Sequence, residues 1–143
     1  MIQSFLEKFK LLSKNNSDEI PSFTQIYREG NLIAESFNRV EGSTKTHMHS
    51  EILCIESAQQ IMDNKFLNEC VMLTSIEPCL MCAGAIIHAR LKEVIYFLEA
   101  TKTEGITSLS IESIYSKNHF PILTLHHSEE IKSIVKDFFK NKR

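Results

Sequence analysis

The chain has no tryptophan, only four glycines and three prolines, and no strong excess of either charge among its 143 residues. So few glycines and prolines exclude a collagen-like chain or a long low-complexity linker. No uninterrupted apolar run approaches the ~20 residues of a membrane-spanning helix, so we expect no membrane segment. The first residues already include Glu7 and Lys8, unlike the apolar core of a signal peptide. We therefore expect a cytoplasmic protein with reduced thiols.

Charge is distributed unevenly along the sequence. The formal net charge of −2 argues against a nucleic-acid binder that depends mainly on electrostatic attraction. Residues 131–143 nevertheless carry four lysines and one arginine against the single acid Asp137, a net +4, which leaves −6 for the rest of the chain. Such a run is most often the solvated face of a terminal helix, but it is also suited to contact with phosphates.

The length and the 43% hydrophobic content are sufficient for one domain with an ordinary core, so we predict a single domain over residues 1–143. The apolar pattern predicts strands at 23–27, 32–37, 71–76, 93–97 and 121–125, with a hairpin turn at Gly30 between the first two. It predicts helices at 2–13, 49–62 and 79–90, one within 106–117, and a last helix from Ile131 onward. Residues 38–46 are predicted as a loop. A strand, a helix and a strand in succession predict parallel pairing, and hence an α/β fold.

Two cysteines three positions apart, Cys79 and Cys82, follow Pro78 at the start of a predicted helix. Proline suits this position because its missing N–H would have had no partner there. The unpaired amides and the dipole of a helix N-terminus favour thiolate over thiol. His49 stands at the start of an earlier predicted helix, and Glu51 follows two residues later. These side chains together could form a metal site.

Two thiolates and one imidazole provide three ligands for a tetrahedral Zn²⁺ and leave the fourth position for water, which indicates a catalytic site. Glu51 can face that position without being a ligand, so it is predicted to carry protons. A His-x-Glu followed by Pro-Cys-x-x-Cys is the signature of zinc-dependent nucleobase deaminases. We therefore predict one Zn²⁺ per chain, held by His49, Cys79 and Cys82, with Glu51 as the catalytic residue.

A Cys-x-x-Cys pair by itself would also suit a redox pair or a structural zinc site. The upstream His-x-Glu reduces these alternatives, because a structural site usually has four protein ligands and needs no base. Cys54 and Cys70 have no motif around them and are expected to be buried as small apolar side chains. His47 remains open as a substitute ligand, a pocket wall or a loop residue without a role.

With these motifs in place, the sequence resembles the cytidine-deaminase-like superfamily, and within it the bacterial tRNA-specific adenosine deaminases. The resemblance extends from about Glu19 to the C-terminus and is densest over residues 77–90, Glu-Pro-Cys-Leu-Met-Cys-Ala-Gly-Ala-Ile-Ile-His-Ala-Arg. It continues at 102–103 and 108–109 and returns at 137–143. Asn38-Arg39 also matches the Asn-Arg that follows the second strand in that family.

The resemblance implies a three-layer α/β/α sandwich around a five-stranded mixed sheet, and a homodimer that packs near the active sites. It implies that the substrate is the anticodon loop of a tRNA, whose wobble adenosine is converted to inosine. Some relatives instead deaminate guanine, cytosine or other free bases. Asn38 is, by resemblance, a substrate-binding residue.

The sequence departs from the family pattern at three places near the motifs. Residues 21–24 read Pro-Ser-Phe-Thr instead of Pro-Val-Gly-Ala, which brings the bulky Phe23 to an expected pocket floor. His47 lies in a segment that differs from the usual Asp-Pro-Thr-Ala, and Glu99 occurs where an Arg is usual, which weakens the case for a phosphate-rich ligand. Three functions therefore stay open: a tRNA adenosine deaminase, a deaminase of a free base, nucleoside or nucleotide, and a zinc-stabilised binding module.

Overall fold

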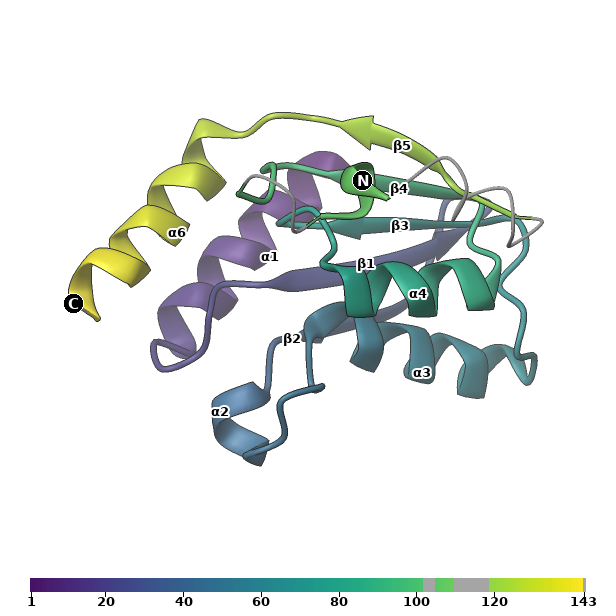
Figure 1. Cartoon of the computed structure of the whole chain (residues 1–143), viewed down its shortest axis with the longest axis horizontal. Helices are drawn as coiled ribbons and strands as arrows, with labels where there is room; N and C mark the ends of the chain where they lie inside the picture. Colours follow the sequence, from purple (N-terminus) through teal and green to yellow (C-terminus); the bar gives the residue numbers. More distant parts are fainter. Residues whose placement is uncertain (102–104, 110–118, 143) are drawn as a thin grey trace.

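The structure, a computed structural model, describes residues 1–101, 105–109 and 119–142 (Figure 1). Its strands are β1 (Phe23–Arg28), β2 (Asn31–Phe37), β3 (Cys70–Thr74), β4 (Glu93–Tyr96) and β5 (Ile122–Leu125). Its helices are α1 (Ile2–Asn15), α2 (Val40–Ser43), α3 (Ser50–Met62), α4 (Leu80–Ala89), α6 (Glu129–Asn141) and the short 3₁₀ helix η1 (Ile106–Ser108). No helix within these described ranges is both long and apolar enough to cross a membrane.

The strands form one mixed sheet in the order β2-β1-β3-β4-β5. β1 runs antiparallel to both β2 and β3, whereas β3, β4 and β5 are parallel to one another. The predicted strand–helix–strand unit is therefore present as β3, α4 and β4. Between β1 and β2 the chain turns at Glu29 and Gly30, both with positive φ (50° and 78°), which is the two-residue hairpin turn whose twist matches that of the strands.

Helices cover both faces of the sheet, so the fold is the expected three-layer sandwich (Figure 1). α3 and α4 pack on one face over an aliphatic cluster that includes Ile26, Met72 and Val94. α1 and α6 pack on the other face over a cluster that is rich in aromatic rings. There the ring of Phe5 lies 5.0 Å from that of Phe23 and 4.8 Å from that of Phe97, between centroids.

This arrangement corrects the expectation for Phe23. The side chain is fully buried in the aromatic cluster under α1 and does not line the pocket. Side chains alternate along an extended segment, so its neighbours Ser22 and Thr24 point to the opposite face, toward α3. Ser22, rather than Phe23, reaches the pocket.

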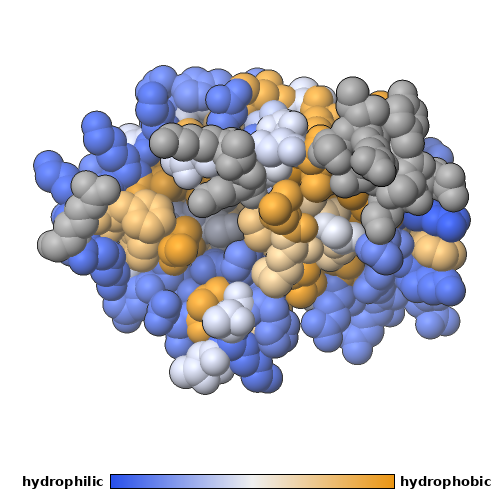
Figure 2. Space-filling view, viewed as in Figure 1, coloured by the Kyte–Doolittle hydropathy of each residue, from blue (hydrophilic) through white to orange (hydrophobic). Residues whose placement is uncertain are grey.

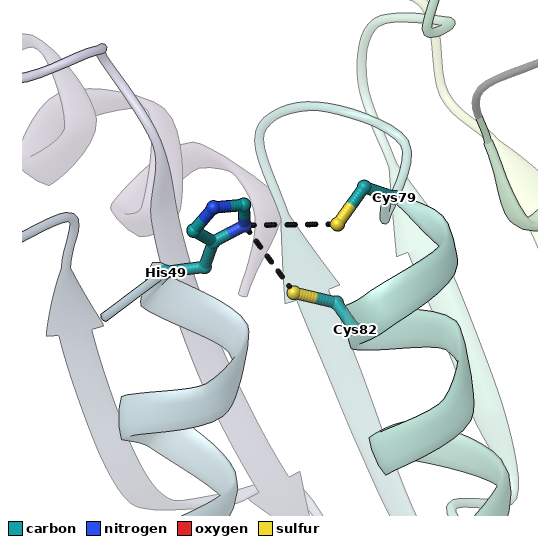
Figure 3. A group of neighbouring side chains, drawn as sticks. All are labelled: His49, Cys79 and Cys82. Atoms are coloured by element: carbon teal, nitrogen blue, oxygen red, sulfur yellow. Dashed lines mark hydrogen bonds between the residues drawn. The ribbon is translucent and has the colours of Figure 1, made fainter. Parts of the chain in front are cut away.

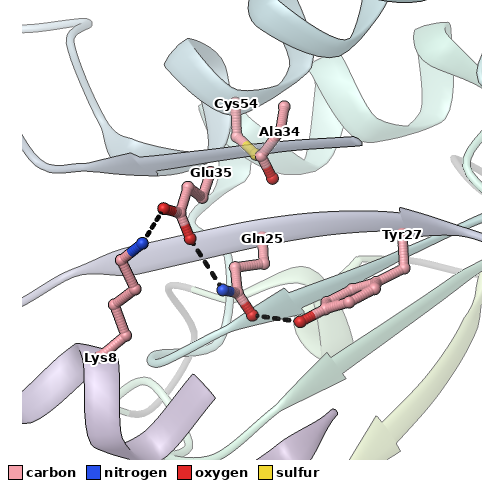
Figure 4. A network of polar contacts seen from close by, with 6 residues as sticks. All are labelled: Lys8, Gln25, Tyr27, Ala34, Glu35 and Cys54. Atoms are coloured by element: carbon pink, nitrogen blue, oxygen red, sulfur yellow. Dashed lines mark hydrogen bonds and ion pairs between the residues drawn. The ribbon is translucent and has the colours of Figure 1, made fainter. Parts of the chain in front are cut away.

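A polar chain ties α1 to the two antiparallel strands on the aromatic face (Figure 4). Lys8 of α1 forms an ion pair with Glu35 of β2, Gln25 of β1 donates to the other oxygen of Glu35 at 2.9 Å, and the hydroxyl of Tyr27 donates to Gln25 at 2.8 Å. Each buried polar group in this chain has a partner, as burial requires. On the other face Cys54 is buried as predicted, and its Sγ contacts the Ala34 carbonyl at 3.4 Å.

Two segments differ from the sequence-based expectation. The predicted loop at 38–46 contains the one-turn helix α2, and the last helix begins at Glu129, two residues earlier than predicted. The earlier start follows from Ser128, whose hydroxyl accepts a hydrogen bond from the backbone N–H of Ile131 at 3.2 Å. Of the segment 106–117, which was predicted to contain a helix, residues 106–109 are described and include η1, and residues 110–117 lie outside the described residues.

Candidate metal centre and cavity

His49 and Cys79 occupy the N-cap positions of α3 and α4, and Cys82 lies in the first turn of α4. Both helices pack on the same face of the sheet and begin at the same end of it, which brings the three side chains together (Figure 3). An N-cap side chain usually accepts a hydrogen bond from its own helix, yet neither His49 nor Cys79 does so. Their side chains are thus available to one another.

The geometry of this group fits a zinc ion. The Nδ1 of His49 lies 3.7 Å from Sγ of Cys79 and 3.6 Å from Sγ of Cys82, and the ligand atoms all lie within 4.8 Å of one another. A tetrahedron with Zn–N near 2.05 Å and Zn–S near 2.3 Å has an N···S edge of about 3.6 Å. The donor set and its spacing therefore suit Zn²⁺. His47 is exposed and is not part of the group.

Electrostatics in the group favour one thiolate beside an imidazolium. Hydrogen bonds from Cys82 and His49 lower the pKa of the Cys79 thiol to about 3. The same contact with Cys79, together with burial, raises the pKa of Cys82. The hydrogen bond to Cys79 raises the pKa of His49. A bound divalent cation would favour the thiolate form at both cysteines.

Glu51 lies beside the three ligands and is almost completely buried, with 4% of its surface exposed. The Sγ of Cys82 lies 3.6 Å from its Oε2, and the side chain lines the same cavity as His49 and Cys79. Burial is the main reason that the pKa of this carboxyl is raised. A buried carboxyl with a raised pKa beside a metal site is suited to both accept and donate a proton.

Four buried hydroxyl side chains lie behind Glu51. Thr74 donates to Oε1 of Glu51 at 3.2 Å, and Ser50 donates to Oε2 at 3.4 Å. The Oγ1 of Thr24 lies 3.0 Å from that of Thr74 and 2.7 Å from Oγ of Ser50, which closes a ring. Ser22 is joined to Ser50 at 2.7 Å and also lines the cavity. We call Thr24, Ser50 and Thr74 the hydroxyl ring.

The cavity has a volume of about 470 Å³ and opens between α6, α2 and the start of α4 (Figure 2). Its apolar walls come from Ile20, Val40, Ile76, Leu98, Val135 and Phe139. Besides Glu51, the acids Glu41, Glu77 and Glu99 line it, and within the described residues no lysine or arginine does. A space of this size with a few converging polar groups is typical of a small-molecule or single-base site.

Comparison with protein families shows to which family this chain belongs. The model of the MafB19-like deaminase family matches residues 2–143. The chain belongs to this deaminase family. The predicted resemblance is thereby confirmed.

Two of the relatives are named for different substrates. A tRNA-specific adenosine deaminase of Aquifex aeolicus is 30% identical over 126 residues, which are 87% of this chain and 83% of the relative. A guanine deaminase of Bacillus subtilis is 41% identical over 76 residues, 53% of this chain and 49% of the relative. A solved structure from work on tRNA:A34 deaminases matches with a TM-score of 0.78 at 24% identity and covers 96% of both chains. That likeness confirms the predicted fold.

Two carboxylates of this deaminase escaped the sequence analysis, and the first is Glu19. It is 7% exposed and accepts hydrogen bonds from Asn38 Nδ2 at 3.3 Å and from the backbone N–H groups of Glu41 and Gly42 at 3.2 and 2.7 Å. Glu19 thus holds α2 in place. Its bond to Asn38 is made through Nδ2 and does not involve Oδ1 of Asn38. Asn38 is itself buried and lines the cavity, where the resemblance expected a substrate residue.

The second carboxylate is Glu77, which binds the segment that crosses in front of Cys79. It accepts hydrogen bonds from the hydroxyl and the backbone N–H of Thr107 at 3.0 and 3.4 Å. Gly105 pairs with Cys79 in an isolated β-bridge, and a Cβ atom at Gly105 would lie 1.4 Å from Oε2 of Glu77. The segment can approach this closely only because residue 105 lacks a side chain.

Proposed function

We propose that this deaminase is a zinc-dependent hydrolytic enzyme that converts adenosine to inosine at the wobble position of tRNA. The observation that carries the proposal is the position of Glu51, whose carboxylate adjoins the His49, Cys79 and Cys82 group and faces the same cavity. A binding module would need the ligands alone and no buried carboxyl beside them. The relatives named tRNA-specific adenosine deaminase support the choice of substrate.

Zinc would be held by Nδ1 of His49 and the Sγ atoms of Cys79 and Cys82, the atoms whose spacing fits it. When bound, the ion supplies a water molecule of lowered pKa as the nucleophile. Glu51 would accept one proton of that water on its carboxylate and transfer it to a ring nitrogen of the base. It would then accept the second proton, from the hydroxyl now bonded to the ring carbon, and transfer it to the amine, which leaves as ammonia. Burial raises the pKa of this carboxyl, which favours its holding a proton between the two transfers.

Asn38 would orient the base in this scheme. Glu19 accepts one of the two Nδ2 hydrogens, so Asn38 can still offer its Oδ1 acceptor and its second N–H to the substrate. The apolar walls of the cavity would hold the faces of the ring system. An adenosine in a tRNA loop would have to be turned out of its stack to reach this depth.

The proposal is tested by ammonia release from an anticodon stem-loop with the zinc-loaded protein. We expect conversion of adenosine to inosine by the wild type. We expect Glu51→Ala to lower turnover by at least about 10²–10⁴-fold, as for other positioned acid–base groups, while zinc content stays at one per chain. A Glu51→Ala protein with near-normal turnover would show that the proton carrier has been assigned wrongly.

A second candidate is a deaminase of a free base or nucleoside, such as guanine. The observation that favours it is the charge of the cavity, whose lining includes Glu41, Glu77 and Glu99, because these acids would repel the phosphates of an RNA. The Bacillus subtilis guanine deaminase among the relatives is consistent with it. Under this alternative the basic end of α6 would be only a solvated surface.

Deleting residues 140–143 separates the two candidates. For tRNA, removal of these cations should weaken stem-loop binding and reduce its salt dependence by a log–log slope of about 0.7 for each phosphate that they neutralise in the wild type. Lys142 forms an ion pair with Asp18 and lies over the ring of Phe138, so the wild-type end is partly neutralised already. Unchanged stem-loop activity, together with faster conversion of free guanine or cytosine, would favour the second candidate.

We further propose the homodimer that the family resemblance implies. Leu80 and Met81 lie between the two ligand cysteines in sequence and are 53% and 42% exposed, an apolar pair next to the metal centre. Light scattering should give the mass of two chains, and Leu80→Glu with Met81→Glu should give one. A monomeric wild-type protein at micromolar concentration would contradict this assembly.

A further inference from the structure

We propose that the hydroxyl ring of Thr24, Ser50 and Thr74 is a positioning device for Glu51. It fixes the orientation of the carboxylate toward the metal centre, so that turnover depends on hydroxyls that do not touch the substrate. This inference rests on the proposed role of Glu51 in proton transfer.

Each oxygen of the Glu51 carboxylate has its own hydroxyl donor. Thr74 serves Oε1 at 3.2 Å and Ser50 serves Oε2 at 3.4 Å, while Cys82 approaches Oε2 at 3.6 Å from the metal side. A rotation of the carboxylate plane would remove a donor from one oxygen or the other. Such a change is poorly compensated, because Thr24, Ser50 and Thr74 have no exposed surface and Glu51 is only 4% exposed.

The donors are themselves held by Thr24, because its Oγ1 contacts both Ser50 and Thr74. The three hydroxyls come from β1, α3 and β3, so the ring joins the two central strands to the first turn of the helix that carries Glu51. The carboxylate is therefore anchored to the sheet as well as to its own helix.

The threonines of the β1–β3 strand pair lie at the end of the pair where Glu51 is found. Thr24 pairs with Thr74 in the β1–β3 register, and the next pair on the same face is Ile26 with Met72, both fully buried in the aliphatic cluster. The face thus changes from apolar to hydroxyl-bearing at the end where the carboxylate lies. Burying three hydroxyls in a core is unfavourable unless they are hydrogen-bonded. Here Thr74 and Ser50 donate to Glu51, and the single hydrogen of Thr24 goes to one of these two hydroxyls.

The first experiment removes one donor without changing its shape. Thr74→Val should lower kcat by about tenfold or more, since a misplaced catalytic group costs up to ~10²-fold, while KM stays within about twofold and zinc content is unchanged. Thr24→Val, which does not touch the carboxylate, should lower kcat in the same direction by less. Thr74→Ser restores the hydroxyl and should recover most of the rate.

Thr124→Val is the matched control. Its hydroxyl donates to the carboxylate of Glu93 at 3.0 Å, a part-buried contact of the same kind between residues that do not line the cavity, and its removal should leave kcat unchanged. If Thr74→Val and Thr124→Val have equal effects on kcat, or if Thr74→Ser fails to recover activity, the ring has only a structural role and the proposal is overturned.

A second measurement needs no substrate. Unfolding free energies of wild type, Thr74→Val, Glu51→Gln and the double variant form a cycle, in which we expect the double variant to be destabilised by less than the two single variants combined. Additive effects would overturn the link between Thr74 and Glu51. If the wild type deaminates nothing tested, the proposed function fails, and this cycle still decides whether the ring holds the carboxylate.

Discussion

The starts of α3 and α4 differ from the start of α6 in what their first side chains do. At α6, Ser128 uses its hydroxyl to bind the N–H of Ile131, which is the ordinary way to satisfy a helix start. At α3 and α4, His49 and Cys79 stand in the equivalent position and make no such bond. The same structural position thus serves helix stability at α6, whereas at α3 and α4 it presents two side chains of the candidate metal site. A helix start that lacks its usual capping bond can in this way indicate a functional position.

Among the changes that test this comparison, removal of the proposed zinc ligands should have the largest effect. Cys79→Ala and Cys82→Ala should each abolish most zinc binding and lower the unfolding temperature in zinc-containing buffer, because metal binding at such sites can contribute about 10–16 kcal/mol in small zinc domains. Elemental analysis and thermal unfolding measure both. Cys70→Ala is the control, since this buried cysteine lies outside the group and its removal should leave zinc content at one per chain. Full zinc occupancy in a Cys79→Ala/Cys82→Ala variant would exclude these ligands.

A second effect is chemical and appears in the zinc-free protein. The pKa of Cys79 is lowered to about 3, so at pH 6 its thiolate predominates, whereas an ordinary thiol of pKa ~8.5 is almost entirely protonated. Iodoacetamide should therefore modify Cys79 first, at least about tenfold faster than Cys54, whose pKa is raised by burial. Peptide mass spectrometry locates the adduct. Zinc should protect the site, and equal labelling of Cys54 would contradict the assignment.

At α6 the expected effect is on stability alone. Ser128→Ala removes the hydroxyl that caps the helix and should lower the free energy of unfolding by about 1 kcal/mol. Zinc content and the rate of Cys79 labelling should not change, because Ser128 does not belong to the metal centre. Urea unfolding and elemental analysis of the same preparation suffice. A decrease in zinc content in this variant would mean that the helix starts are not independent.

The smallest effect is expected from a substitution that gives α4 the kind of N-cap residue found at α6. In chelator, Cys79→Ser should be more stable than Cys79→Ala by about 0.5–1 kcal/mol, since serine can cap α4 as Ser128 caps α6. Urea midpoints at equal slope give the difference. Equal stability of the two variants would show that the backbone at Cys79 cannot accept a capping side chain, even though its extended conformation (φ −70°, ψ 173°) suits one.

The repeating apolar pattern made most of the fold predictable. The spacing of His49, Glu51, Cys79 and Cys82 predicted that these side chains would lie together, as they do, and zinc binding by them stays a prediction. Both signals are local, because helix periodicity and a Cys-x-x-Cys turn are contained in short segments. The α2 turn was missed since its N–H groups are satisfied by Glu19, some twenty positions earlier in the sequence. Phe23 was misplaced because its facing depends on strand register, which also governs the hydroxyl ring.

The missing side chain at Gly105 limits how this protein can vary. Its backbone (φ −103°, ψ 170°) is one that any residue adopts, so only space restricts the position. A methyl group there would overlap the carboxylate of Glu77, itself buried and bonded to Thr107. In a mutant library directed at substrate range, the cavity-lining Glu99 is a position to vary, whereas Thr107 should keep a hydroxyl for Glu77 and codon 105 should be kept as glycine unless codon 77 is changed to a shorter residue at the same time.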